Sequence, residues 1–505
     1  MAPTEAENPT SPTLTTVIGL EIHCELDTRT KMFCRCLNRF GDPPNTHTCP
    51  VCIGMPGALP VMNRQAVDMT IKAGLALNCQ VPEFTKWDRK GYYYPDLPKN
   101  YQISQYDLPL AREGYLDVPL PGGRTSRIRV RRAHLEEDAG KNVHDLAAHT
   151  GVDLNRAGVP LLEIVSEPDI HSVEEVMGYS RSMRRLVRWL GISQANMQMG
   201  HMRFEPNISI WVGDGQRIFD ESAGYFTPIL EIKNLNSFRS LEKTVEWIID
   251  YHRAQIIERG RDWSLEKVGK QNWGYRDDLE CCEFQRGKEE AHDYRYFPDP
   301  DLAPVRVEAA WRDRIAAEIG ELPIARKGRY LAQYQLSDKE ADALTEDAPT
   351  GDLLDSAVKL GGPVRRVVNL MMGRMMAASN QKGSTLAQLG VSAEALAELA
   401  GMMEAGKLSA SAADRVMEVL LAEGGKPLDI ATRLGVLAVS DASAIEAWVD
   451  AAIAANAGPA EQVRTGDKKA KQAFGFLMGA VMKLSGGKAP PAAVKQLLEQ
   501  KLSPK

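Results

Sequence analysis

The sequence predicts a multidomain protein, with an α+β region followed by all-helical regions. Three observations lead to this fold class. The 505 residues exceed one ordinary domain, for which roughly 150 residues is the usual expectation. Up to about residue 300, short β-forming runs are separated by Gly, Pro and Asn. Beyond about residue 310, Ala, Leu and Met recur at helical spacing.

The β-forming runs alternate apolar and polar residues, and amphipathic helical segments intervene. The strand runs are 15–26, 127–132, 160–165, 207–212 and 229–233, and the clearest helical segments are 172–191 and 237–260. In the first run, GLEIHCEL, we expect Glu21, His23 and Glu25 on one face, because strand side chains alternate.

Shifts in composition predict four parts. Residues 1–14 are rich in Pro and Thr and are expected to be a disordered lead-in. An α+β domain is expected at 15–300, a helical domain at 301–425 and a small helical tail domain at 426–505. From Glu461 to the end, nine Lys/Arg face three acids, a local charge of +6 in a chain of net charge -6. Such a tail suits contact with phosphates.

Composition excludes several classes of protein. With 44% hydrophobic and 25% charged residues, the chain is neither collagen-like nor wholly disordered. It has no apolar run of the ~18 residues that a membrane helix needs, and its first residues do not resemble a secretion signal. We therefore expect a cytoplasmic protein without a membrane partner. A Walker A loop, GxGxxG, HExxH and GxSxG are all absent from the sequence, so any ATP site is not a P-loop.

Four of the eight cysteines crowd into one segment as two pairs. Cys34 and Cys36 precede Cys49 and Cys52, and four thiolates suit tetrahedral Zn²⁺. Because sulfur would fill every position, the predicted zinc site is structural; the alternative is four reduced thiols. The adjacent Cys281 and Cys282 are expected to be incidental.

Carboxylates on strand-like segments are the second chemical signal. Glu21 and His23, the acids Glu136, Glu137 and Asp138 of HLEEDAGK, Glu205 and Glu231 have the chemistry of Mg²⁺ ligands. Taken singly, each of these residues is more often a solvated residue on a strand face, and spacing does not show that they converge. The basic clusters 124–132 and 181–188 either meet phosphate or are solvated. The tyrosine-rich stretch 86–107 is either a pocket wall or a nucleic-acid stacking surface.

A resemblance to a known family rests on motifs that occur in order. They are VIGLEIHCEL, CPVCIGMPGALPV, DRKGYYYPDLPKNYQISQYD, HLEEDAGK, DLNRAGVPLLEIVSEPDI, LEIKNLNSFRSLEK and EEAHDYRYFPDPDL. Over about 15–505 the chain resembles the B subunits of the aspartyl/glutamyl-tRNA(Asn/Gln) amidotransferases, the GatB family. One departure is RFEPN at 203–207, where many members have Arg-Cys-Asp-Ala-Asn, so the carboxylate of Glu205 is one methylene longer.

The resemblance implies an ATP-dependent carbon–nitrogen ligase. With ATP and Mg²⁺ it phosphorylates the side-chain carboxylate of Asp-tRNA(Asn) or Glu-tRNA(Gln), and ammonia then displaces the phosphate. The implied partners are the amidase (A) subunit, which hydrolyses glutamine, and the small C subunit, in a heterotrimer. Misacylated tRNA is the substrate, contacted by the tail domain, and an aspartyl- or glutamyl-tRNA synthetase is a further expected partner. The implied fold is a cradle resembling glutamine-synthetase-like catalytic folds.

Site residues are carried over position by position. The matching magnesium ligands are Glu21, His23, Glu136, Glu205 and Glu231, and the zinc ligands are Cys34, Cys36, Cys49 and Cys52. Glu21, His23, Glu136 and Lys233 are expected to be catalytic. One alternative stays open, a non-catalytic tRNA-binding scaffold. A free-standing ligase that uses free ammonia is disfavoured, because the C-terminal segment resembles the family's tRNA-contacting tail. Acids converging on one cavity would distinguish an enzyme from the scaffold, which has no need of buried carboxylates.

Overall fold

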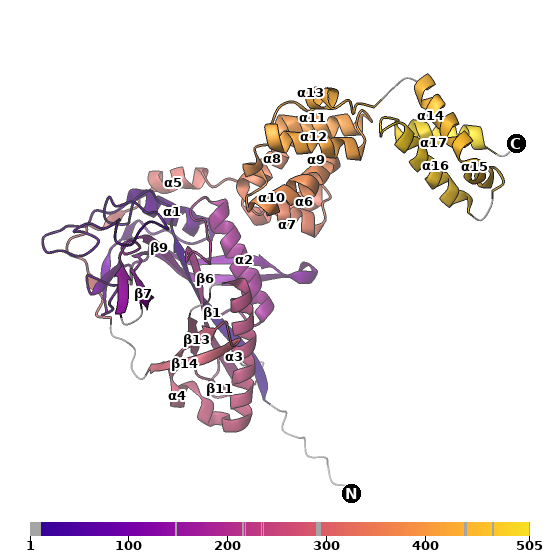
Figure 1. The fold of residues 1–505 in the computed structure, drawn as a ribbon. Helices are drawn as coiled ribbons and strands as arrows, with labels where there is room; N and C mark the ends of the chain where they lie inside the picture. Colours follow the sequence, from indigo (N-terminus) through magenta and orange to yellow (C-terminus); the bar gives the residue numbers. More distant parts are fainter. Residues whose placement is uncertain are drawn as a thin grey trace, which may run out of the picture. The chain divides into compact units, whose positions relative to one another are not determined.

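The structure is a computed structural model that describes residues 12–146, 149–214, 217, 219–233, 235, 237–288, 294–438, 442–466 and 469–503. The chain forms two compact units, Met1–Leu322 and Pro323–Lys505 (Figure 1). Of the expected lead-in, residues 1–11 lie outside the described residues, and the first strand already begins at Thr13. Among the described residues, no helix combines the length and apolar character needed to cross a membrane.

A nine-stranded sheet dominates the first unit. Its strands are β1 (Thr13–Glu25), β5 (Ala111–Pro119), β6 (Thr125–Glu137), β9 (Pro160–Ser166), β10 (Met202–Gly213), β11 (Gly224–Phe226), β12 (Leu230–Lys233), β13 (Lys270–Arg276) and β14 (Cys281–Lys288). The order is β14-β13-β12-β10-β1-β9-β6-β5, with β11 beside β10. The β12/β13 pair is parallel, and the other pairs are antiparallel. The central β1 therefore lies between β9 and β10, which come much later in the chain.

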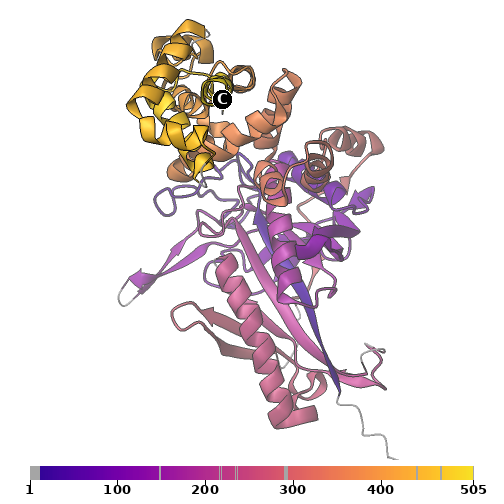
Figure 2. The same cartoon turned by 90° about the vertical axis from the view of Figure 1, so that its right-hand side faces the viewer.

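Helices pack on one face of this sheet. They are α1 (Arg64–Ala76), α2 (Val173–Trp189) and α3 (Phe238–Arg259), and Figures 1 and 2 show α2 and α3 lying along the strands. The covered face of β1 carries Ile18, Leu20, Ile22 and Cys24, each no more than 1% exposed. Asparagine or serine side chains accept hydrogen bonds from the first-turn N–H groups of all three helices, which fixes where each begins.

A small sheet contacts the main sheet through its strand β4. It contains β3 (Asp88–Gly91), β4 (Tyr101–Ser104) and β15 (Phe297–Pro298). The remaining elements of this unit are the pair β2 (Phe84–Thr85) and β16 (Val305–Arg306), the hairpin β7 (Lys141–Leu146) and β8 (His149–Asp153), the helices α4 (Leu265–Val268) and α5 (Ala309–Ala317), and the 3-10 turns η1 (Pro121–Gly123) and η2 (Gly260–Trp263).

The second unit is helical in its described part. Its elements are α6 (Pro323–Gln333), α7 (Asp338–Leu344), α8 (Ala348–Lys359), α9 (Val364–Leu370), the π-turn η3 (Met371–Met375), α10 (Met376–Lys382), the 3-10 turn η4 (Ala387–Leu389), α11 (Ala393–Glu404), α12 (Ala410–Glu423), α13 (Pro427–Arg433), α14 (Ala442–Ala455), α15 (Ala457–Arg464), α16 (Ala470–Leu484) and α17 (Pro491–Leu502). Two separate hydrophobic clusters run from Tyr330 to Val436 and from Ile445 to Leu502. The predicted order, a mixed α and β region and then a helical region, is confirmed.

Candidate active site and tetracysteine group

Strand register brings the acidic residues onto one face of the main sheet. In β1, Glu21 and His23 point away from the helix-covered side, since the alternate residues are buried in the core. Glu21 lies opposite Glu205 of β10, and His23 lies opposite Glu163 of β9. On the next strand, His134 of β6 is also opposite Glu163. Four neighbouring strands thus place acids and imidazoles side by side on the face that we call the polar face.

Glu163 lies at the centre of this polar face. Its carboxylate is 3.5 Å from His23 Nε2 and 3.7 Å from His134 Nε2. Ligand atoms of His23, Glu136 and Glu163 all lie within 4.8 Å of one another. Burial alone would raise the pKa of Glu163, but the two imidazoles hold it well below its usual range. Burial also opposes charge on His23, yet contact with Glu163 and the charge of Glu205 raise its pKa.

Glu136 is held by groups from the small sheet. Its carboxylate accepts hydrogen bonds from Ser104 Oγ and Gln102 Nε2, both at 2.6 Å, and Lys90 Nζ lies 3.5 Å away. Burial would raise the pKa of Glu136, but the Lys90 charge and His134 outweigh it and hold the pKa at about 2. A buried carboxylate is thus kept ionised and fixed in position.

Lys233 bridges two of the expected metal ligands. Its Nζ lies 2.9 Å from both Glu205 and Glu231. Burial would lower the pKa of Lys233, but these two carboxylates raise it. Glu21 instead accepts a hydrogen bond from Asn207 at 3.2 Å, and burial together with the charges of Glu163 and Glu231 raises its pKa. The ammonium of Lys233 therefore occupies a point suited to a cation.

The residues present fit a hard divalent cation such as Mg²⁺. Carboxylate oxygens and one or two imidazoles are the donor set that such an ion accepts. Within the described structure, the buried His23 Nδ1 has no hydrogen-bond partner, and it faces Glu205 at 3.9 Å. Four of the five expected ligands form two groups: His23 and Glu136 meet around Glu163, while Glu205 and Glu231 meet around Lys233. The fifth, Glu21, belongs to neither group and contacts Asn207.

A second acidic pair, the half-buried Glu25 and the buried Asp138, adjoins the first cluster. Glu25 and Asp138 approach each other, and Arg203 Nη2 lies 3.1 Å from Asp138. Burial and the neighbouring Asp138 raise the pKa of Glu25 to about 8. Burial opposes ionisation of Asp138 as well, but Arg203 and Arg156 lower its pKa to about 2. Glu25 is therefore the member of this pair whose charged form is disfavoured, while the two arginines favour the charged form of Asp138.

A cavity of ≈ 350 Å³ opens beside Glu21 on the polar face. Apolar side chains that include Val17 and Phe226 line it, together with the cations Arg131 and Lys270. A Cβ added to Gly19, which also lines the cavity, would meet no heavy atom within 4 Å. The volume and mixed lining suit a small organic ligand that carries negative charge.

The tyrosine-rich stretch 86–107 divides between a buried part and an exposed part. Tyr92 donates a hydrogen bond to Gln102 beside Glu136, so this part walls the acid cluster. Tyr93 and Tyr94 are 81% and 56% exposed.

Four arginines of the basic cluster 124–132 form ion pairs at the surface: Arg124 with Glu174, Arg127 with Asp117, Arg129 with Asp169 and Arg131 with Glu167.

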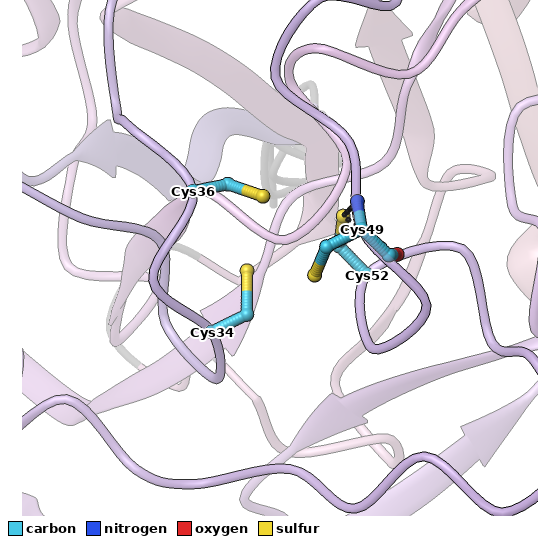
Figure 3. A group of neighbouring side chains, drawn as sticks. All are labelled: Cys34, Cys36, Cys49 and Cys52. Carbon is cyan, nitrogen blue, oxygen red and sulfur yellow. Dashed lines mark hydrogen bonds between the residues drawn. The ribbon is translucent and has the colours of Figure 1, made fainter.

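The four clustered cysteines converge from two loops. Figure 3 shows Cys34 and Cys36 pointing from one loop toward Cys49 and Cys52 on the other. Their four sulfur atoms lie within 4.8 Å of one another, which fits a tetrahedral thiolate metal site. Cys49 N–H donates to Cys52 Sγ at 3.1 Å, and a hydrogen bond from the Cys34 thiol lowers the pKa of Cys52 to about 5. Among the described residues, Cys281 and Cys282 belong to no such group.

Sequence reasoning did not single out several residues on the polar face or beside it. The most important is Glu163, inside the apolar run PLLEIV; others are His134, Lys90, Gln102, Ser104 and Arg203. A signal existed for two of them. A carboxylate within a run of buried strand residues needs a partner, and His134 precedes Glu136 by the two residues that keep it on the same strand face. Lys90, Gln102 and Ser104 lie in the stretch 86–107, for which a pocket wall is one of the two interpretations. Their contacts with Glu136, and the contact of Arg203 with Asp138, depend on the fold.

Fold and site together define the class: a multidomain protein whose N-terminal sheet bears buried acids and histidines on one face, with a tetracysteine group beside the loop before β9. Two family models match the chain, the "GatB/GatE catalytic domain" over residues 16–313 and the "GatB domain" over residues 352–502. The chain belongs to the GatB family.

Curated relatives match over almost their whole length. A protein of Carboxydothermus hydrogenoformans is 42% identical over 491 residues, which are 96% of this chain and 98% of the relative. One from Halorhodospira halophila is 44% identical over 489 residues, again 96% and 98% of the two chains. Both relatives are named as the B subunit of an aspartyl/glutamyl-tRNA(Asn/Gln) amidotransferase.

Proposed function

We propose that this chain is the B subunit of a tRNA-dependent amidotransferase, acting on Asp-tRNA(Asn), Glu-tRNA(Gln) or both. Membership of the family and the names of the relatives support this function. The observation that carries the catalytic part is the convergence of Glu163, Glu136 and His23 on one buried patch. A tRNA-binding scaffold needs no buried carboxylates, which are costly unless they are paired or hold a metal.

The proposed reaction has two steps. A carboxylate oxygen of the aminoacyl side chain attacks the γ-phosphorus of ATP, the bond to the ADP oxygen breaks, and an acyl phosphate forms. Ammonia then attacks the acyl carbon and expels inorganic phosphate, and the nitrogen loses a proton to give the amide. The ammonia comes from glutamine hydrolysed by the partner amidase (the A subunit), within a heterotrimer that includes the small C subunit.

Residues on the polar face and beside it are proposed to have different roles in this reaction. We propose that Glu21, His23, Glu136, Glu205 and Glu231 hold Mg²⁺, with Glu163 added to the set. Bound Mg²⁺ would supply positive charge to the transferring phosphoryl group. Lys233 holds Glu205 and Glu231 in position and brings a further positive charge to the same face. The Lys90 charge and the hydrogen bonds from Gln102 and Ser104 keep Glu136 ionised and oriented.

We propose that the base of ATP lies in the cavity beside Glu21. Its apolar walls suit a base, Arg131 and Lys270 suit phosphates, and Glu21 links it to the acid cluster. The variant Gly19→Val tests this location, because the new side chain projects into open space and a β-branched residue suits a strand. We expect the KM for ATP to rise at least about tenfold, since the valine takes up room that the base needs. The KM for misacylated tRNA should not change; an unchanged KM for ATP would place the base elsewhere.

The remaining features have supporting roles. We propose that the four clustered cysteines hold a structural Zn²⁺. The sheet with its polar face is proposed to be a cradle of the glutamine-synthetase-like kind, with domains near 15–300, 301–425 and 426–505. The separate hydrophobic cluster from Ile445 to Leu502 supports a tail domain with its own core. The positive charge of the last 45 residues supports contact with tRNA. The synthetase that supplies the misacylated tRNA is proposed as a further partner.

The central test uses the complete amidotransferase reconstituted with its partner subunits. His23→Ala and Glu136→Ala should abolish formation of amidated tRNA, because each loses a proposed metal ligand. Glutamine hydrolysis by the partner amidase, assayed without tRNA, should persist. The matched control is Glu174→Gln in the exposed Glu174–Arg124 ion pair, which should be fully active. Near-normal activity of both alanine variants at saturating Mg²⁺ would favour the scaffold. Supplying each misacylated tRNA separately identifies the substrate.

A further inference from the structure

Lys31 is a fully buried lysine beside the tetracysteine group. Its side chain has 0% exposure and is among the largest fully buried side chains of the chain. The Nζ atom donates hydrogen bonds to the carbonyl oxygens of His47, at 2.7 Å, and Leu154, at 3.2 Å. Its third neighbour is Cys52 Sγ at 3.7 Å. The ammonium group therefore contacts both the second cysteine loop and the loop that precedes β9.

A buried ammonium is costly unless an opposite charge lies near it. Within the described part of the chain, no carboxylate lies within ion-pair distance of Lys31. Its two carbonyl partners satisfy hydrogen bonds but carry no net charge. The sulfur of Cys52 is the neighbour that becomes negative when a metal binds, because metals bind the thiolate.

Four thiolates around Zn²⁺ carry a net charge of about -2. Such a group, buried in part, needs positive charge nearby as much as Lys31 needs negative charge. We propose that Lys31 is the counter-cation of the tetracysteine zinc site and ties that site to the loop before β9. This inference rests on the zinc site proposed above and assigns Lys31 a positioning role, without contact to substrate.

The same loop leads to the acid cluster. The N–H of Met32, next to Lys31, donates to the carbonyl of Gly158, and the N–H of Gly158 donates to the carbonyl of Asp138. From Gly158 the chain enters β9, which carries Glu163. In the same loop, the side-chain oxygen of Asn155 accepts a hydrogen bond from the His47 N–H at 2.8 Å, which also connects the loop to the cysteine segment. Charge balance at the zinc site therefore helps to hold the end of the polar face in position.

The test compares zinc binding by three full-length proteins under reducing conditions: the wild type, Lys31→Met and Lys72→Met. Lys72 is the matched control, since its Nζ also donates to a backbone carbonyl, that of Leu190 at 3.1 Å, away from the cysteines. Competition with a chromogenic chelator gives the Kd for zinc. We expect the Kd of Lys31→Met to rise about tenfold to a hundredfold, as for other groups that support metal ligands. Lys72→Met should match the wild type.

Cobalt substitution gives a readout that packing alone would not move. A positive charge beside Cys52 stabilises the sulfur lone pairs, so removing it lowers the energy of the sulfur-to-Co²⁺ charge-transfer band. We expect this band to shift to longer wavelength in Lys31→Met and to stay in place in Lys72→Met. If Lys31→Met does not fold, the variants Lys31→Arg and Lys31→Gln make the same comparison. We expect the arginine variant, which keeps the positive charge, to bind zinc tightly and the glutamine variant to bind it weakly.

The outcomes separate the two proposals. Wild-type protein that holds no zinc refutes the zinc site itself, and the inference about Lys31 falls with it. Wild-type protein that holds zinc, with equal Kd and band position in Lys31→Met, leaves the zinc site standing and overturns the role of Lys31. Equal zinc binding by the arginine and glutamine variants overturns it as well.

Discussion

Replacing Glu163 by glutamine tests the centre of the polar face. The variant keeps the shape of the side chain and removes one negative charge. That charge lies 3.5 Å from His23 Nε2, 3.7 Å from His134 Nε2 and 3.9 Å from Arg132 Nη2. Breaking a buried ion pair costs about 3–5 kcal/mol. Glutamine still forms hydrogen bonds, so we expect a smaller loss of folding free energy, about 1–3 kcal/mol.

The loss of activity should be larger than this loss of stability suggests. If Glu163 holds Mg²⁺ with His23 and Glu136, its charge stabilises the transition state by about 3 kcal/mol or more, which is a fall in kcat of roughly 100-fold. The Mg²⁺ concentration for half-maximal rate should also rise at least about tenfold.

The assay measures amidated tRNA formed by the reconstituted complex across a Mg²⁺ titration. Seven of the eight tryptophans precede Leu322, so their fluorescence reports whether the first unit is folded. Glu174→Gln, the surface control, should change stability by less than ~0.5 kcal/mol and leave the rate unchanged. A folded Glu163→Gln protein with a normal rate and a normal Mg²⁺ requirement would show that the acid cluster serves another purpose.

Three further predictions address stability, zinc and the tail. Burial lowers the pKa of His252 from near 6.5 to about 4, so folding favours the neutral imidazole. Its contribution to the free energy of unfolding is complete above pH 6.5, and about 3 kcal/mol of it should be lost as the pH falls from 6.5 to 4. Urea unfolding of the His252→Gln variant at several pH values should lack this loss. Cys34→Ser together with Cys49→Ser should abolish zinc binding, measured by elemental analysis; bound zinc at the wild-type level would refute the site. Truncation after Ala438 should raise the KM for misacylated tRNA at least about tenfold and flatten its salt dependence; an unchanged KM would show that the tail's charge has no part in binding.

The elements of the first unit could be predicted because their signals are local. The run 15–26 corresponds to β1 at Thr13–Glu25, and the segment 237–260 to α3 at Phe238–Arg259. Alternation along β1 also predicted that Glu21 and His23 share a face, which the structure shows. Each of these inferences needs only the period of the side chains along one element.

The composition of the site could not be predicted in the same way, because it depends on which strands are neighbours. β9 and β10 flank β1 although they are more than a hundred residues away in sequence, so the contact between His23 and Glu163 is set by pairing register. Glu163 lies in a run that has the composition of a buried strand, and only its opposition to two histidines marks it as part of a site. Lys31 is similar: an isolated lysine in the sequence gives no sign that it is buried against Cys52.

The two faces of β1 separate stability from chemistry. Leu20 and Ile22 lie on the covered face with 1% exposure or less, where large-to-small changes cost about 2–5 kcal/mol through lost burial and cavities. Gly19 and His23 lie on the polar face, where a change removes a contact or adds a side chain without opening the core. Because side chains alternate with a period of two, adjacent residues of one strand belong to different roles. Loss of activity in a folded polar-face variant therefore reports on the chemistry of the site, since the packing that holds the sheet is left intact.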